Sequence, residues 1–306
     1  MRLIFVATGD IALPAFRHLL EHGPRPLALV TQPDKPVGRH QALTPPQIKV
    51  EALVAGIPVY QPEKIGDATA DLASLEPEIL VVMAYGQILK NDIITLPGKA
   101  IINLHASILP QYRGASCIQA AIDHGDAETG ITVMHVVRKL DAGDVIVIKT
   151  LPIGPQETGG ELHDRLADLA PLALAEALQQ LENGTATRTP QDDAAHTYAP
   201  KLERDHGRLD WTQSAAALER RIRAYDPWPG TYTVALEAGR EKRLKIFPPV
   251  AVVESVLSPG EVFVEDGRLL VGCGAGALMI QQVQPEGSKR MSATDYLRGR
   301  KLERLV

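Results

Sequence analysis

Short apolar runs alternate with helical patterns through the first half of the chain. The runs Leu3–Ala7, Leu27–Thr31, Ile79–Met83 and Ala100–Leu104 are apolar at almost every position, so both faces of each would be buried. Strands buried on both faces are typical of parallel sheets covered by helices. The β-α-β-α order therefore predicts an α/β fold with a doubly wound, mostly parallel, Rossmann-like sheet. Helices are expected near residues 12–22, 47–55 and 87–96, and a brief strand at 58–60.

The pattern changes in the second half. Two strand patterns, Ile131–Val137 and Val145–Leu151, flank a turn, and a long helical pattern follows at about 160–182. The polar, proline-containing stretch Asn183–Gly207 is typical of a linker. Beyond it come one helical pattern and several short strand patterns, at the spacing of a small, OB-like β-barrel. We predict a Rossmann-like catalytic domain at 1–189, a linker at 190–206 and a smaller OB-like domain at 207–306.

A glycine motif in the second domain needs a separate interpretation. The segment Gly272–Ala277 matches the dinucleotide-binding pattern G-x-G-x-x-[GA], but that pattern binds pyrophosphate only where a helix follows it. Here strand-like residues stand on both sides. We therefore interpret the segment as a hairpin turn, and the sequence offers no support for a nicotinamide cofactor.

Composition and charge narrow the class of protein. The chain has 306 residues, 45% hydrophobic and 23% charged, and only two cysteines, too few for a disulfide framework or a structural zinc site. No apolar run reaches the roughly 18 residues that span a bilayer, so we expect a cytoplasmic protein without membrane contact. We also expect a monomer. Residues 1–200 carry a net charge of −8 and residues 201–306 one of +3. The basic second part hints at a polyanionic partner, although so small an excess is also typical of compositional noise.

Candidate chemistry begins where the fourth apolar run ends. Asn103 and His105 stand at positions i and i+2, a spacing that places both side chains on one face of a strand. They lie at the carboxyl end of a predicted parallel strand, where open α/β sheets bind ligands. Asn and His at a strand end can also merely bond the backbone. The polar loop that follows, Ala106–Gly114, has no obvious packing role, and we favour the functional interpretation.

A carboxylate 36 residues further on completes a candidate site. Asp141 lies in the turn Leu140–Asp144, whose glycine permits a tight bend toward the sheet. Asn, His and Asp without an adjacent Ser, Thr or Cys nucleophile indicate direct transfer rather than a covalent intermediate. Cys117 is a possible nucleophile, but its surroundings indicate a packed helix residue.

Several segments together resemble one family. NLHASILPQYRG, GDAETGITVMHVVRKLDAGDV, VVMAYGQIL and TQPDKPVGR are similar to segments of the folate-dependent formyltransferases, and the likeness covers essentially the whole chain. It is strongest to the branch that formylates initiator methionyl-tRNA for translation initiation. The resemblance implies 10-formyltetrahydrofolate as formyl donor, no metal, and Asn103, His105 and Asp141 as the catalytic centre, with Asn103 and His105 stabilising a tetrahedral intermediate. It also implies a folate pocket formed by the segments that contain Met83, Tyr85, Gly86, Ser107, Ile108, Leu109, Pro110, Arg138, Lys139 and Leu140.

The chain departs from the family pattern at two places. Ala106 stands where the family usually has glycine, which would limit the backbone if φ were positive there. The loop at 32–46 has fewer cations than usual, so the expected nucleic-acid contacts are Lys35, Arg39 and Lys49, and RNA binding should be less sensitive to salt.

Three other functions remain open from the sequence. The same chemistry could act on an amino-sugar nucleotide, the fold could only hydrolyse formyltetrahydrofolate, or the protein could be a non-enzymatic RNA-binding module. The intact trio counts against the last of these, and the basic second domain mildly favours RNA over a sugar. Whether His105 or Asp141 moves the proton is also open.

Overall fold

The computed structural model describes residues 1–38, 41–298 and 300–306. The chain divides into two compact units. The first contains Met1–Gly114, Thr129–Leu151 and His163–Tyr198, and the second contains Ala115–Glu128, Pro152–Leu162 and Ala199–Val306. The boundaries expected from the sequence, at 189 and 206, stay a prediction.

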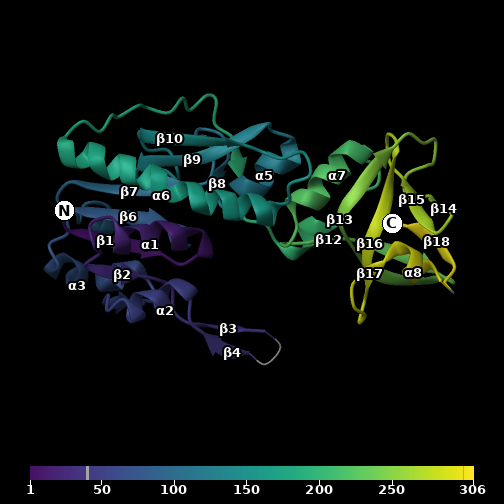
Figure 1. Ribbon diagram of the computed structural model, residues 1–306, viewed down its shortest axis with the longest axis horizontal. Helices are drawn as coiled ribbons and strands as arrows, with labels where there is room; N and C mark the ends of the chain where they lie inside the picture. Colours follow the sequence, from purple (N-terminus) through teal and green to yellow (C-terminus); the bar gives the residue numbers. More distant parts are fainter. Residues whose placement is uncertain (39–40, 299) are drawn as a thin grey trace. The chain divides into compact units, whose positions relative to one another are not determined.

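A seven-stranded sheet forms the centre of the first unit (Figure 1). Strand β1 pairs in parallel with β2 on one side and β6 on the other, and β2–β5 and β6–β7 are parallel as well. Strands β7 and β9 pair antiparallel, so the sheet is mixed but parallel from β5 to β7, and the mostly parallel, Rossmann-like prediction is confirmed. The sheet order is β10-β9-β7-β6-β1-β2-β5, with β1 Leu3–Ala7, β2 Ala28–Val30, β5 Val59–Tyr60, β6 Ile79–Met83, β7 Ala100–His105, β9 Glu128–His135 and β10 Val145–Pro152.

Burial explains why these strands were visible in the sequence. All five residues of β1 and all five of β6 are buried, because neighbouring strands and covering layers exclude water from both faces. Successive strands are added on one side of β1 as β2 and β5, and then on its other side as β6, β7, β9 and β10. The direction of strand addition therefore reverses between β1 and β6. Open α/β sheets bind ligands at the carboxyl ends of the strands beside such a point.

The helices of the first unit mostly follow the predicted ranges. The exceptions are α4, which is shorter than the predicted 87–96, and α3, which the sequence pattern did not indicate. Gly86 has a φ of +86° and Lys90 is extended, so helical geometry cannot begin before Asn91. The helices are α1 Leu13–Glu21, α2 Gln47–Val54, α3 Thr69–Ser74, α4 Asn91–Ile94 and α6 Gly159–Asn183, whose first four residues belong to the second unit.

The proline-rich stretch 32–46 is not wholly irregular. Strands β3 (Lys35–Val37) and β4 (Ala42–Thr44) pair antiparallel, with Lys35 opposite Thr44, and form a small hairpin (Figure 1). The interpretation of this stretch as a loop was wrong. A two-stranded ribbon consists of edges only, so Pro36 can lack its N–H without breaking a ladder.

The second unit contains an antiparallel, nearly closed barrel, as predicted. Its strands follow the order β14-β15-β16-β13-β12-β18, and a bridge between Glu261 and Arg304 joins the two ends of this order. The segment Gly272–Ala277 turns between β15 and β16, which confirms the hairpin interpretation. The elements are β12 Thr231–Glu237, β13 Arg240–Val253, β14 Val262–Glu265, β15 Arg268–Gly272, β16 Ala277–Pro285, β17 Met291–Ser292, β18 Leu302–Leu305, α5 Cys117–His124, α7 Ala215–Ala224 and α8 Ala293–Leu297.

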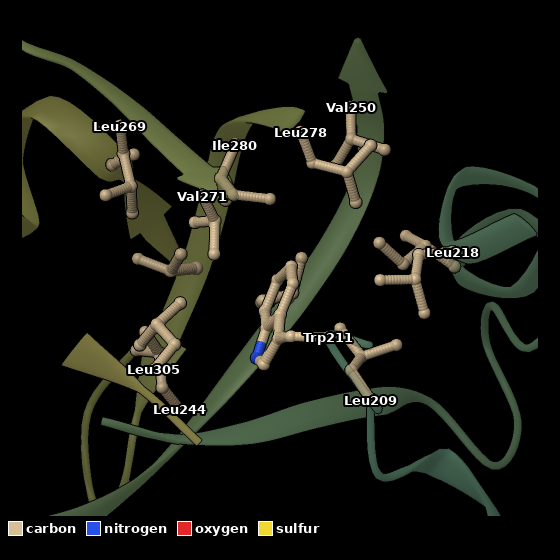
Figure 2. Close-up of a cluster of buried hydrophobic side chains, with 14 of the residues drawn as sticks. Leu209, Trp211, Leu218, Leu244, Val250, Leu269, Val271, Leu278, Ile280 and Leu305 are labelled. Atoms are coloured by element: carbon tan, nitrogen blue, oxygen red, sulfur yellow. The ribbon is translucent and has the colours of Figure 1, made fainter. Parts of the chain in front are cut away.

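Strand β13, with 14 residues, is much longer than the short strands that the sequence pattern indicates for this unit. Its pairing with β16 shifts register between Phe247 and Val250, so the Pro248–Pro249 pair is absorbed as a bulge rather than ending the strand. The barrel core is built around Trp211, which is 4% exposed and packs among aliphatic side chains such as Leu218 and Leu278 (Figure 2). Its indole N–H donates to Thr233 Oγ1 at 2.9 Å, which satisfies the one polar atom of the ring.

Candidate active site

The two residues predicted from the end of the fourth apolar run lie on β7. Asn103 is opposite Met134 and His105 is opposite Thr132 on the antiparallel strand β9. Directly opposed residues share a face of the sheet, so these four side chains form one surface. Asn103 is half-buried, and His105 is 7% exposed. This face is at the carboxyl ends of β6 and β7, where the sequence predicted a site.

The imidazole and the carboxylate converge. His105 Nδ1 lies 3.8 Å from Asp141 Oδ2, with both side chains largely buried. On the other side of the ring, His105 Nε2 lies 2.9 Å from the carbonyl oxygen of Tyr112. A carbonyl can only accept, so Nε2 carries the hydrogen, and Nδ1 is the ring nitrogen that faces the Asp141 carboxylate.

Asp141 is held in an uncommon backbone conformation. Its φ is +48°, the left-handed region that costs a non-glycine residue free energy and is found where surrounding contacts impose it. Its Oδ2 accepts the backbone N–H of Gly114 at 2.8 Å. The carboxylate is thus fixed between the imidazole and the loop that follows β7.

The loop after β7 is braced by Thr132. The Thr132 hydroxyl donates to Ser107 O at 2.6 Å and accepts the N–H of Leu109 at 3.1 Å. Ser107 and Leu109 are buried, while Ile108 and Pro110 are partly exposed. Of these predicted folate residues, Ile108 and Pro110 therefore offer the accessible side chains.

Ala106 fits its position without strain. It is buried, and it is not among the described residues with positive φ. The backbone there does not need glycine, so this departure from the family pattern has no structural cost.

The segment after β6 contributes its backbone. The carbonyl oxygen of Tyr85 accepts from Thr8 Oγ1 and from Gln32 Nε2, each at 3.2 Å, which ties the ends of β1, β2 and β6 together. The Tyr85 ring packs in the hydrophobic core of the sheet, and burial raises the pKa of its phenol to about 12. Met83 is also buried. Any ligand contact by this segment would use the main chain near Gly86, whose φ is +86°.

The remaining predicted residues are at the surface. Arg138, Lys139 and Leu140 are exposed and directly precede Asp141. Lys35 is exposed on β3, whereas the Lys49 ammonium on α2 contacts both carboxylate oxygens of Asp34 at 2.8 Å. Arg39 lies outside the described residues.

Sequence reasoning missed two residues beside Asp141, the buried Arg113 and the partly buried Gln191. The Gln191 side chain donates to the carbonyl oxygens of Asp141 and Gly143, and Arg113 donates to Gln191. Both were hidden because Arg113 looked like one more polar loop residue and Gln191 fell in the predicted linker. The signal that could have revealed Gln191 is the polar run Gln191–Asp193 directly after Pro190.

In the described part of the chain, no group of three or more His, Cys, Asp and Glu is placed to hold a metal ion. No helix in the same part is long and apolar enough to cross a membrane.

Family models match most of the chain. Residues 3–178 match the model described as formyl transferase, and residues 201–301 match the model described as formyl transferase, C-terminal domain.

Curated proteins are similar over nearly the full length. The chain is 52% identical to a methionyl-tRNA formyltransferase of Akkermansia muciniphila, over 98% of this chain and 96% of that protein. It is 43% identical to a methionyl-tRNA formyltransferase of Geobacter metallireducens, over 99% of this chain and 97% of that protein.

Solved structures share the fold. HypX from Aquifex aeolicus in complex with tetrahydrofolic acid superposes with a TM-score of 0.65 at 20% identity, covering 97% of this chain and 47% of that one. An N-formyltransferase from Helicobacter canadensis in complex with folinic acid and dTDP-3-aminofucose superposes with a TM-score of 0.69 at 16% identity, covering 95% of this chain and 100% of that one.

Proposed function

Because the chain belongs to the formyl transferase family, we propose that it transfers the formyl group of 10-formyltetrahydrofolate to the amino group of initiator methionyl-tRNA. The observations that carry the proposal are that Asn103 and His105 share one face of β7 and that the Asp141 carboxylate lies 3.8 Å from His105 Nδ1. The 52% identity to a methionyl-tRNA formyltransferase supports this choice of acceptor. We also propose a cytoplasmic monomer with a catalytic domain at 1–189 and an OB-like domain at 207–306.

The reaction begins when the neutral α-amine of the methionyl group attacks the formyl carbon of the donor. An α-amine has a pKa of about 7.7–8.0, so part of it is neutral at pH 7 without a strong base. The carbonyl π electrons move to oxygen and form a tetrahedral oxyanion. The half-buried Asn103 amide N–H donates a hydrogen bond to that oxygen, and it is worth more there than in water because the surroundings exclude solvent.

His105 carries a proton between the two nitrogens. Its Nε2–H is bonded to Tyr112 O, and we assign Nδ1 as the atom that takes a proton from the attacking amine. Collapse of the oxyanion breaks the bond from the formyl carbon to the donor nitrogen, and that nitrogen receives the proton. Asp141, 3.8 Å from Nδ1, stabilises the imidazolium while it holds the proton.

The donor is a substrate whose pterin we place against the three segments of the predicted folate pocket. Main chain near Gly86, the partly exposed Ile108 and Pro110, and the exposed Leu140 offer the polar and apolar contacts. HypX of similar fold is solved with tetrahydrofolic acid.

The acceptor is identified by comparing the products formed when each candidate is supplied in a separate reaction. The purified protein is given 10-formyltetrahydrofolate with initiator methionyl-tRNA, with a dTDP-amino sugar, or with no acceptor. We expect formylmethionyl-tRNA at a rate at least a hundredfold above formylation of the sugar and above donor hydrolysis. Formylated sugar alone, or formate released equally fast with and without tRNA, would contradict the proposed acceptor.

We further propose that Lys35, Arg39 and Lys49 contact tRNA phosphates. Lys35 gives the cleanest test because Lys49 is already neutralised in part by Asp34. Lys35→Ala should weaken tRNA binding and lower the slope of log K against log salt concentration by about 1, since one phosphate contact is lost. The exposed Lys64 supplies the control variant Lys64→Ala. A Lys35→Ala slope equal to that of the control would remove Lys35 from the interface.

A further inference from the structure

We propose that Gln191 is a positioning residue that holds Asp141 in its catalytic conformation, and that Arg113 holds Gln191. This inference rests on the proposed function, because it requires Asp141 to act beside His105. It concerns the 189–197 segment, the part of the first unit that follows α6. The three residues are far apart in sequence but are joined by a continuous set of hydrogen bonds.

The side-chain amide of Gln191 has all its hydrogen-bonding capacity in use. Its Nε2 donates to Asp141 O at 2.9 Å and to Gly143 O at 2.8 Å. Its Oε1 accepts from Arg113 Nε at 3.1 Å and from Arg113 Nη2 at 2.8 Å. An amide has two donors and two lone pairs. Because carbonyls only accept and guanidinium only donates, the orientation of this amide is unambiguous.

Arg113 is a costly residue to bury, which indicates a specific role. Its side chain is 3% exposed, and its Nη1 donates to Asp193 Oδ1 at 2.8 Å. Hydrogen bonds from Lys139 and Arg113 lower the pKa of Asp193 to about 2. A buried guanidinium needs such partners to offset its desolvation. Two of its N–H groups nevertheless donate to one oxygen of a neutral side chain, that of Gln191, rather than to a carboxylate.

Asp141 is therefore held by hydrogen bonds to both its main chain and its side chain. Its carbonyl oxygen accepts from Gln191, and its carboxylate accepts from the N–H of Gly114, the neighbour of Arg113. Between these contacts the backbone has a φ of +48°. The left-handed conformation persists only where surrounding contacts impose it. Gln191 imposes it from one side, and this sets the carboxylate against His105 Nδ1 at 3.8 Å.

The 189–197 segment also fixes the loop after β7. The Thr197 hydroxyl accepts the N–H of Tyr112 at 2.8 Å, and Thr197 O accepts the N–H of Arg113 at 3.0 Å. Tyr112 O is the partner of His105 Nε2. One segment thus braces the carbonyl that orients the imidazole and, through Gln191, the carboxylate beside it.

The experiment compares Gln191→Ala and Gln191→Glu with the control Gln179→Ala, a glutamine exposed on α6. The glutamate variant keeps its size and its bonds from Arg113 but has no N–H for the two carbonyls, so it preserves the fold while removing the proposed action. We expect both Gln191 variants to lower kcat by about 10- to 100-fold, the usual cost of a misplacement near 1 Å. KM for both substrates should stay within about threefold, and the control should match the parent.

A double-mutant cycle with Asp141→Asn separates positioning from a general structural role. If Gln191 acts through Asp141, adding Gln191→Ala to Asp141→Asn causes no further loss of kcat. By nitrogen NMR, the His105 Nδ1 resonance of Gln191→Ala should move from its parental position in the same direction as that of Asp141→Asn, since in both variants the carboxylate no longer lies beside Nδ1. This readout needs no turnover.

Two results would overturn the inference: kcat of both Gln191 variants within twofold of the parent, or the same factor lost again on top of Asp141→Asn. An Asp141→Asn enzyme as active as the parent would instead remove the proposed catalytic role of Asp141, so the two failures are distinguishable.

Discussion

Asn103→Ala is expected to lower kcat by about 10²–10³, the usual cost of removing one oxyanion donor. The methyl group of alanine cannot donate to the oxyanion. Substrate binding is not affected by this loss, because the negative charge on the oxygen does not yet exist in the ground state. The affinity for the folate donor should therefore change little, and KM for both substrates should stay near the parental values. Steady-state kinetics at several donor and tRNA concentrations measure both parameters.

The exposed Asn91, at the start of α4, supplies the matched control. Asn91→Ala removes the same amide from the same unit and should leave kcat unchanged. An Asn103→Ala enzyme that keeps more than a third of the parental turnover would show that Asn103 is not the oxyanion donor. A loss confined to donor binding would make it a folate-binding residue instead.

Gly143→Ala is expected to lower kcat by about a hundredfold, although Gly143 touches no reacting atom. A Cβ built on this glycine would lie 1.7 Å from the carbonyl oxygen of His135 and 2.8 Å from its carbonyl carbon. Both are backbone atoms of β9, so the turn that carries Asp141 must move away. A displacement near 1 Å would separate the Asp141 carboxylate from His105 and break the bond from Gln191 to Gly143 O.

The same substitution should also lower the free energy of unfolding by about 1–3 kcal/mol, as overpacking of a filled site usually does. Gly98→Ala is the control, because its Cβ would meet nothing nearer than Pro77 O at 4.0 Å. Chemical denaturation and kinetics on both variants separate the two effects. A Gly143→Ala enzyme with parental kcat would mean that the position of Asp141 does not limit the reaction.

The strands beneath the site could be predicted because their signal is local. The ranges Leu3–Ala7 and Ile79–Met83 match β1 and β6 residue for residue, since a strand buried on both faces must be apolar at successive positions. The same reasoning placed Asn103 and His105 on one face at a carboxyl end. Prolines were less reliable as signs that a strand ends. Pro248–Pro249 forms a bulge within β13, and Pro36, beside Lys35, lies within a hairpin.

The sequence by itself determined the class of fold, the strand that carries Asn103 and His105, and the residue types of the chemistry, because alternation and apolar runs are properties of neighbouring residues. Only the tertiary structure decided that Asp141 lies beside His105 Nδ1, that the Tyr85 ring faces the core, and that Gln191 bonds to Asp141 O. The first and last of these contacts join residues 36 and 50 positions apart. No periodicity encodes such a pairing, because it depends on how whole strands and loops pack and on which buried polar groups must find partners.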